Sequence, residues 1–204
     1  MKEKLLVMLD MQDAMNSRVN PDWRQANNPW YRAIWTECAE MLDHYGWKWW
    51  KHQTPELDQV RLELVDIFHF AMSDALLDGS DNDGVADKIL AELADARSEI
   101  DIRVAIETMA QSTIANHAMQ FADFANVMNL IEMDFDQLYR MYVGKNVLNF
   151  FRQDHGYKDG SYIKVWQGRE DNEHLADLLD ELDSEADTFK DSVYAGLESR
   201  YPSN

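Results

Sequence analysis

Two pairs of carboxylates recur in the sequence at the spacing of one helical turn. Glu37 and Glu40 form the first pair, and Glu63 and Asp66 form the second. Residues at i and i+3 of a helix share a face, so each pair presents two carboxylates together. The 22 residues of 41–62 leave room for a turn between two antiparallel helices, which would bring all four carboxylates close together. Such a cluster repels itself unless cations lie within it, and Mg²⁺ prefers carboxylate and phosphate oxygens. The alternative is that these acids are solvated on the polar sides of their helices.

A second candidate set is cationic. In the segment "KNVLNFFR", Lys145, Asn149 and Arg152 fall at i, i+4 and i+7 and therefore share one helical face. The formal net charge of the chain is −19, so two cations beside an amide suggest a surface that holds an acidic ligand. The alternative is ordinary solvated surface. Lys158 and Lys164 follow in a glycine-containing loop of the kind that can close over phosphates.

Amides and tryptophans form a third set. Gln12 and Asn16 lie at i and i+4, and their amides offer both donors and acceptors, which suits the edge of a nucleobase. An exposed or capping amide pair fits the same spacing equally well. The segment "GWKWWK" places Trp47, Trp49 and Trp50 beside two lysines. Because tryptophan is costly to expose, we expect at least one of the three in the core, and the others there or in an aromatic wall for a base.

Composition limits the class of protein. The chain has 204 residues, of which 46% are hydrophobic, enough for one globular domain with a sizeable core. Its 38 acidic against 19 basic residues argue against nucleic acids and anionic membranes as partners. A single cysteine, Cys38, excludes an internal disulfide and fits a reducing compartment. The chain also lacks a signal pattern and an apolar stretch as long as a membrane span, so we expect it in the cytoplasm.

The elements that position these residues are predicted to be helices almost throughout. Only 4 prolines and 8 glycines occur, and long strand-like alternation is missing. We expect helices at about 4–17, from Pro29 to Tyr45, from the cap Thr54 with Pro55 in first position to about Leu77, twice within 84–131, at 134–153 and at 170–185. Residues 154–169 are expected to form a loop, and 186–204 an acidic, frayed segment. The prediction is a single all-α catalytic domain over 1–204, with residues 79–133 as an inserted helical pair.

The order of these motifs resembles a known family. The sequence E-x-x-E followed by E-x-x-D is similar to that of the all-α nucleoside triphosphate pyrophosphatases. More specifically, "WTECAEMLDHYGWKWWK", "ELVDIFHF" and "GKNVLNFFRQDHGYKDGSYIKVWQGREDN" resemble the dimeric, all-α dUTPases. The resemblance implies a helical bundle of the pyrophosphatase type that forms a homodimer. It also implies Mg²⁺-dependent hydrolysis of dUTP to dUMP and pyrophosphate by attack on the β-phosphorus, and usually of dUDP to dUMP. A broader specificity that includes dCTP stays open.

The same resemblance implies roles for individual residues. The predicted Mg²⁺ ligands are Glu37, Glu40, Glu63 and Asp66, with Glu37 or Glu40 also orienting or deprotonating the attacking water. The predicted triphosphate ligands are Lys145, Arg152, Lys158 and Lys164. The predicted contacts to the base or sugar are Gln12, Asn16, Trp49, His69, Phe70, Asn146 and Asn149. For His69 the alternative is a core histidine with a satisfied hydrogen bond.

Two other classes of protein stay open, and one kind of site is excluded. Asp66-x-x-His69 resembles the carboxylate–x–x–His motif of di-iron bundles, but the first acidic pair has no histidine at the matching offset. A pI of about 4.5 fits a non-enzymatic acidic binding protein. That class of protein does not explain the clustered lysines, arginine and tryptophans. The segment "DGSDNDG" does not fit a calcium loop, because Gly79 and Leu90 would occupy positions that require carboxylates.

Overall fold

The structure is a computed structural model that describes residues 1–202 of the chain. Helices make up most of the described residues, and the strands among them form one short two-stranded sheet. The predicted all-α class is thereby confirmed. The chain divides into two compact units, Met1–Leu138 (unit 1) and Tyr139–Asn204 (unit 2). Within the described part of the chain, no helix is both long enough and apolar enough to cross a membrane.

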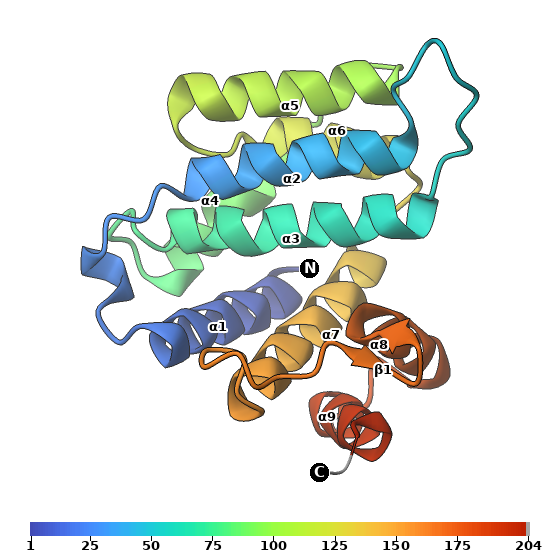
Figure 1. The fold of residues 1–204 in the computed structure, drawn as a ribbon. Coiled ribbons are helices and arrows are strands. Elements are labelled where there is room, and N and C mark those ends of the chain that lie inside the picture. The colour runs from blue at the N-terminus through green and yellow to red at the C-terminus, as the bar shows by residue number, and fades with distance from the viewer. Residues whose placement is uncertain (203–204) are drawn as a thin grey trace. The chain divides into compact units, whose positions relative to one another are not determined.

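Unit 1 begins with three long helices. Helix α1 (Lys2–Val19) leads through the short 3₁₀ helix η1 (Trp23–Gln25) to α2 (Trp30–Tyr45), and a loop then connects α2 to α3 (Leu57–Ala75). Helices α2 and α3 lie side by side and run antiparallel (Figure 1). This is the arrangement predicted from the 22 residues that separate the two acidic pairs in the sequence.

The start of α3 differs from the prediction. The helix begins at Leu57, so Thr54 does not cap it and Pro55 lies outside it. The reason is a backbone hydrogen bond from the N–H of Glu56 to the carbonyl of His44 at 3.0 Å, which ties the chain before the helix to the end of α2. The predicted start of α2 near Pro29 is confirmed, because that helix begins at Trp30, directly after Pro29.

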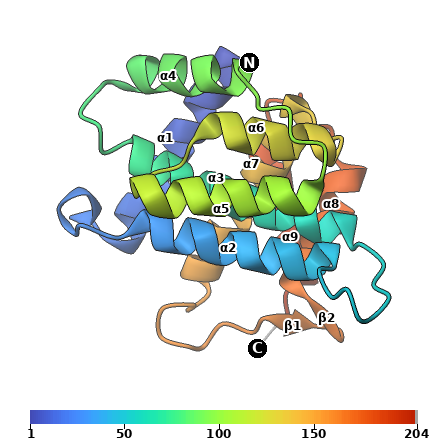
Figure 2. The ribbon, with the colours of Figure 1, turned by 90° about the horizontal axis from the view of Figure 1, so that it is seen from above.

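Three helices occupy the stretch in which two were expected. They are α4 (Asn82–Ala94), α5 (Ile102–Asn116) and α6 (Phe121–Leu130). Helix α5 starts anew because the Asp101 side chain accepts hydrogen bonds from the first turn, and it ends at His117, whose φ of 54° is left-handed. In unit 1, α5 packs against α2, and α6 packs against both α4 and α5 (Figure 2). That residues 79–133 form an inserted subdomain stays a prediction, as does a single catalytic domain over 1–204.

The burial pattern of α3 explains why its acidic residues are available. Leu64, Phe68 and Met72 follow one another at intervals of four residues and are fully buried. Burial of such a stripe removes apolar surface from water at about 25 cal/mol per Å² and anchors the helix. Because that face is taken by the core, Glu63 and Asp66 lie on a different side of the helix and are only half-buried.

Helix α7 (Phe135–Asp154) begins in unit 1 and continues into unit 2. It is followed by an antiparallel hairpin of β1 (Val165–Trp166) and β2 (Arg169–Glu170), then by α8 (Asp171–Glu181) and α9 (Phe189–Arg200). The hairpin lies where only a loop was expected.

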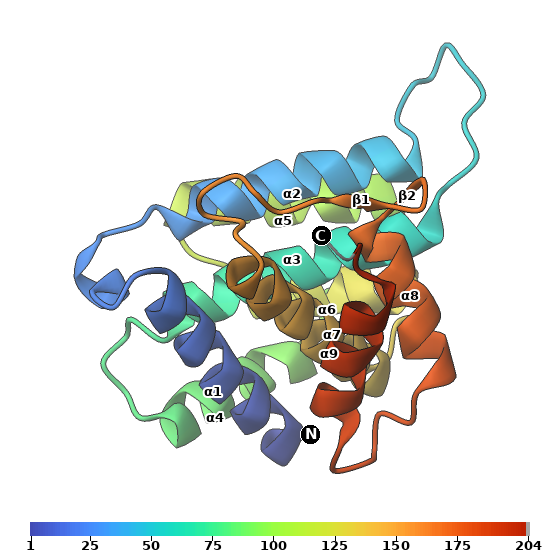
Figure 3. The same ribbon diagram turned by 60° about the horizontal axis from the view of Figure 1, so that its bottom comes forward.

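Helices α8 and α9 lie side by side in unit 2 (Figure 3). A Cβ on Gly196 of α9 would approach Leu178 of α8 to 2.4 Å, so glycine permits this close packing. The prediction of a frayed C-terminal segment was wrong, because Phe189, Val193 and Leu197 form a buried stripe that fixes α9.

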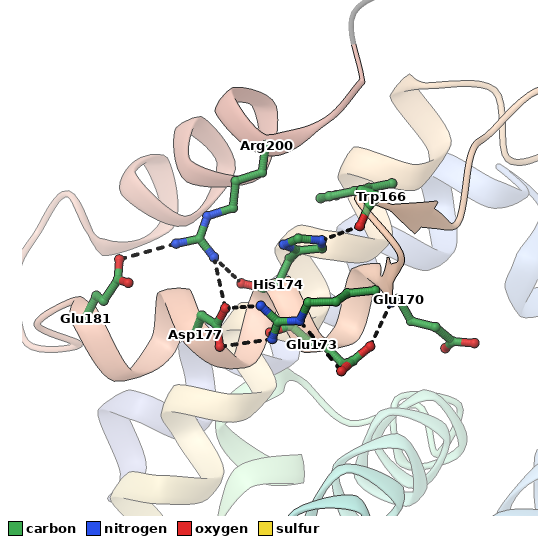
Figure 4. Close-up of polar contacts among 8 residues, drawn as sticks. Trp166, Glu170, Glu173, His174, Asp177, Glu181 and Arg200 are labelled. Carbon is green, nitrogen blue, oxygen red and sulfur yellow. Dashed lines mark hydrogen bonds and ion pairs between the residues drawn. The ribbon is translucent and has the colours of Figure 1, made fainter.

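Asp177 of α8 links the hairpin and α9 through two arginines (Figure 4). Arg169 of β2 donates to it from Nη1 at 2.6 Å, and the Nη1 of Arg200 on α9 lies 3.7 Å from the same carboxylate. Arg200 also donates to the backbone carbonyl of His174, whose Nε2 lies 2.9 Å from the Trp166 carbonyl. Polar contacts therefore hold the elements of unit 2 together around α8.

Candidate active site

Three of the four predicted metal ligands meet between α2 and α3. Glu37, Glu40 and Glu63 each offer a carboxylate oxygen, and these oxygens lie within 4.8 Å of one another. Asp66 belongs to the same electrostatic group. Burial raises the pKa of Glu37, and the charges of Asp66, Glu63 and Glu40 raise it further, to about 8. At neutral pH this carboxyl therefore holds its proton, because burial and the like charges of its neighbours both disfavour the ionised form.

A histidine for which the sequence motifs predict no role lies beside this cluster. His44 comes from the last turn of α2, and its Nε2 lies 3.5 Å from Oε1 of Glu63. Its Nδ1 lies 2.9 Å from Oε2 of Glu56, just before α3. The position of His44, one turn beyond Glu40, was the signal in the sequence that could have indicated it.

The predicted base-reading amides are buried in a polar network of unit 1. Gln12 and Asn16 of α1 both donate to the hydroxyl of Ser73 in α3, at 2.9 Å and 3.0 Å. Nδ1 of His69 lies 2.7 Å from Oε1 of Gln12. The amide pair is therefore neither exposed nor a helix cap, and His69 is a buried histidine with a hydrogen bond on Nδ1. Phe70 stacks on Trp30, with ring centroids 6.3 Å apart.

The cationic face of α7 is built around an ion pair in unit 2. Arg152 binds Asp171 with two hydrogen bonds, and its Nη1 donates to Oδ1 of Asn149 at 3.2 Å. The shared helical face of Asn149 and Arg152 is thus present. The hydroxyl of Tyr162 donates a hydrogen bond to Oδ2 of the same carboxylate at 2.9 Å. The sequence motifs predict no role for Asp171, although it lies in the "GREDN" segment.

The other predicted cations of unit 2 differ in exposure. Lys145 is only 6% exposed, and its Nζ lies 3.4 Å from Oδ1 of Asn172. The neighbouring Asn146, a predicted contact to the base, is fully buried. By contrast, Lys158 is exposed, and Lys164 forms a surface ion pair with Glu170 at 3.0 Å.

Comparison with known proteins adds an independent finding. A family model described as dUTPase matches residues 4–157, about three quarters of the chain. The chain belongs to the dUTPase family. A search among curated proteins gave no match. Membership confirms the resemblance drawn from the sequence, and it makes this dUTPase a dUTP-hydrolysing enzyme of all-α fold whose substrate is a nucleotide.

The dUTPase family also implies a divalent metal cofactor, and the acidic cluster fits one. The donors that come together in the described residues are all carboxylates, which are hard oxygen ligands. Such a set suits a hard divalent cation and not the thiolate or imidazole chemistry of zinc sites. The di-iron alternative gains no support, since the three side chains that come together among the described residues are all glutamates and His69 is not one of them.

The tryptophans of this dUTPase depart from the prediction that at least one is core. Trp47, Trp49 and Trp50 are 40%, 86% and 59% exposed. All three lie in the loop between α2 and α3, which extends beyond the ends of both helices (Figure 1). Their rings instead contact one another edge to face, with centroids 5.3 Å and 4.5 Å apart. Because the rings contact one another, part of each ring is shielded from water without burial in the core. The prediction considered only the hydrophobicity of tryptophan and did not include this contact.

Proposed function

We propose that this dUTPase hydrolyses dUTP to dUMP and pyrophosphate with Mg²⁺ held by Glu37, Glu40, Glu63 and Asp66. The observation that carries the proposal is the convergence of carboxylates from two antiparallel helices. Bound Mg²⁺ would neutralise charge on the triphosphate and acidify a water molecule. Glu37 or Glu40 orients the attacking water or accepts its proton. A carboxylate is a suitable base for this step when a bound cation offsets the charges of the neighbouring carboxylates, so that it ionises.

The nucleoside and phosphate contacts follow the same proposal. The predicted contacts to uracil and the deoxyribose are Gln12, Asn16, Trp49, His69, Phe70, Asn146 and Asn149. The triphosphate is bound by cations of unit 2, namely Lys145, Arg152, Lys158 and Lys164. Support comes from the polar network around the amides and from the charges of the cationic set. Positive side chains at the phosphates stabilise the charge that develops on the leaving pyrophosphate.

The proposal extends to dUDP. Water that attacks the β-phosphorus forms a P–O bond there and breaks the bond to the oxygen that bridges the α- and β-phosphorus. With dUTP the products are dUMP and pyrophosphate, and with dUDP they are dUMP and orthophosphate. A broader enzyme that also accepts dCTP is the second candidate function.

We also propose that the protein acts as a homodimer. The exposed tryptophans and other exposed apolar side chains, among them Trp35, Ile100 and Ile114, support this. Apolar patches of this kind commonly mark surfaces that become buried in an assembly.

Phosphorus NMR of the products tests the function directly. The purified protein is incubated with Mg²⁺ and, separately, with dUTP, dUDP, dCTP, dTTP and UTP. We expect dUMP and pyrophosphate from dUTP, with isotope-labelled water oxygen appearing in pyrophosphate and not in dUMP. Formation of dUDP and orthophosphate from dUTP, or no turnover, would refute the proposal. Equal turnover of dCTP would support the broader enzyme instead.

A further inference from the structure

Ser73 lies at the centre of the buried polar network of unit 1. Its side chain is 0% exposed, and it lies near the C-terminal end of α3, on the buried side of that helix. The hydroxyl contacts three groups: Nε2 of Gln12 at 2.9 Å, Nδ2 of Asn16 at 3.0 Å and the backbone carbonyl of His69 at 2.9 Å. No role follows for this residue from the sequence motifs.

The direction of these hydrogen bonds is fixed by the single proton of the hydroxyl. Ser73 donates that proton to the carbonyl of His69, four residues earlier in the helix, as helical serines commonly do. The oxygen of Ser73 can then only accept from other partners. Both amides must therefore turn their NH₂ groups, and not their carbonyl oxygens, toward Ser73.

This polarity extends through the rest of the network. With its NH₂ group on Ser73, Gln12 directs Oε1 to Nδ1 of His69 at 2.7 Å. Its Nε2 also donates to Oδ1 of Asn16 at 3.1 Å. As long as Ser73 donates to the His69 carbonyl, reversal of either amide would place a carbonyl oxygen against the Ser73 oxygen with no proton between them.

We propose that Ser73 fixes the orientation of Gln12 and Asn16 and thereby sets the preference of this enzyme for uracil over cytosine. The inference rests on the proposed function, in which these two amides read the base. Uracil presents a donor at N3 and an acceptor at O4, whereas cytosine presents an acceptor at N3 and a donor at its 4-amino group. A reversed amide exchanges its own donor and acceptor with almost no change in shape. An amide that is held in one orientation can therefore match one of these bases and leaves unpaired groups against the other.

Ser73 is accordingly a positioning residue, and replacing it should change specificity. The test compares kcat/KM for dUTP and for dCTP in the wild type and in Ser73→Ala. Without the hydroxyl, both amide orientations become accessible, and the dUTP to dCTP ratio should fall by about tenfold or more. A residue that only stabilised the fold would lower both values together and leave the ratio unchanged.

Ser112→Ala is the matched control. Ser112 is also a helical serine of unit 1, with its hydroxyl 2.6 Å from Oδ2 of Asp123 and 3.1 Å from a backbone carbonyl in its own helix. It has no contact with the amides among the described hydrogen bonds, so the ratio should stay at the wild-type value. Ser73→Cys, close to serine in size but a weak acceptor, provides a second variant and should lower the ratio in the same direction.

The outcomes separate this inference from the proposed function. A wild type that does not hydrolyse dUTP refutes the function itself. An active wild type together with unchanged ratios in Ser73→Ala and Ser73→Cys refutes only the role of Ser73. A wild type that hydrolyses dCTP as well as dUTP also overturns the inference, because no preference would then exist for Ser73 to set.

Discussion

The guanidinium of Arg152 and the carboxylate of Asp171 form a bidentate ion pair, with Nε to Oδ2 at 2.8 Å and Nη2 to Oδ1 at 2.9 Å. The Asp171 side chain is fully buried and that of Arg152 is 13% exposed. Burial alone would raise the pKa of Asp171, but hydrogen bonds and charge from Arg152 outweigh it and hold the pKa below its usual value. The Nε–Nη2 edge of Arg152 is thus committed to Asp171, and Nη1 donates to Asn149.

Removing one partner of this pair should destabilise the protein strongly. Asp171→Asn leaves a buried guanidinium without its counter-charge, and the free energy of unfolding should fall by about 3–5 kcal/mol. Asp177→Asn is the control, because Asp177 and its partner Arg169 are both about two-fifths exposed; its loss should stay within about 1 kcal/mol. Urea unfolding measures both, and equal losses would contradict the assignment of Asp171 as the buried anchor.

Removing both partners should separate stability from activity. In Arg152→Met combined with Asp171→Leu no buried charge is left unpaired, so much of the lost stability should return. If Arg152 binds phosphate, kcat/KM for dUTP and for dCTP should remain about tenfold or more below wild type, since both nucleotides carry the same phosphates. Recovery of turnover along with stability would make Arg152 a structural brace.

Helical periodicity and spacing were enough to predict the carboxylate cluster and the antiparallel α2 and α3, because both depend on local geometry along the chain. The third helix within 84–131 was missed because the sequence is amphipathic before and after each boundary of α5. Those boundaries depend on the cap at Asp101 and on the left-handed backbone of His117. Ser73 was missed for a different reason. The hydroxyl of Ser73 acquires a role only because the fold places Gln12 and Asn16 of α1 against it.

The metal-free cluster should release a proton when it binds Mg²⁺. The pKa of Glu37 is raised from 4.5 to about 8, so at neutral pH the native state holds a proton that the unfolded chain lacks. The free energy of unfolding of the metal-free protein should therefore decrease from pH 4.5 to about pH 8 as far as Glu37 contributes. Mg²⁺ needs the ionised carboxylate, so its affinity should rise with pH over the same range.

Calorimetric titration in buffers of different ionisation enthalpy measures that proton. At neutral pH the apparent binding enthalpy should depend on the buffer, and well above the pKa of Glu37 this dependence should vanish. In Glu37→Gln it should be absent throughout. Buffer-independent enthalpies for the wild type at neutral pH would show that Glu37 is already ionised.

The proposed homodimer has a simple physical signature. Light scattering at micromolar concentration should give twice the chain mass of 23.8 kDa. Because apolar contacts are not screened by ions, high salt should leave the dimer intact. A fully active protein with the mass of one chain would refute the dimer while leaving the active-site assignment standing.

The most direct test of the account is the turnover number for dUTP at saturating Mg²⁺ in Glu37→Gln, Glu40→Gln and Asp66→Asn. Each change removes a proposed metal ligand, so kcat should fall by about two orders of magnitude or more while the fold is retained. The matched control is Asp43→Asn, an exposed acid on the same helix as Glu37 and Glu40, which should keep wild-type turnover. Near-normal turnover in all three cluster variants would contradict the assignment of the active site.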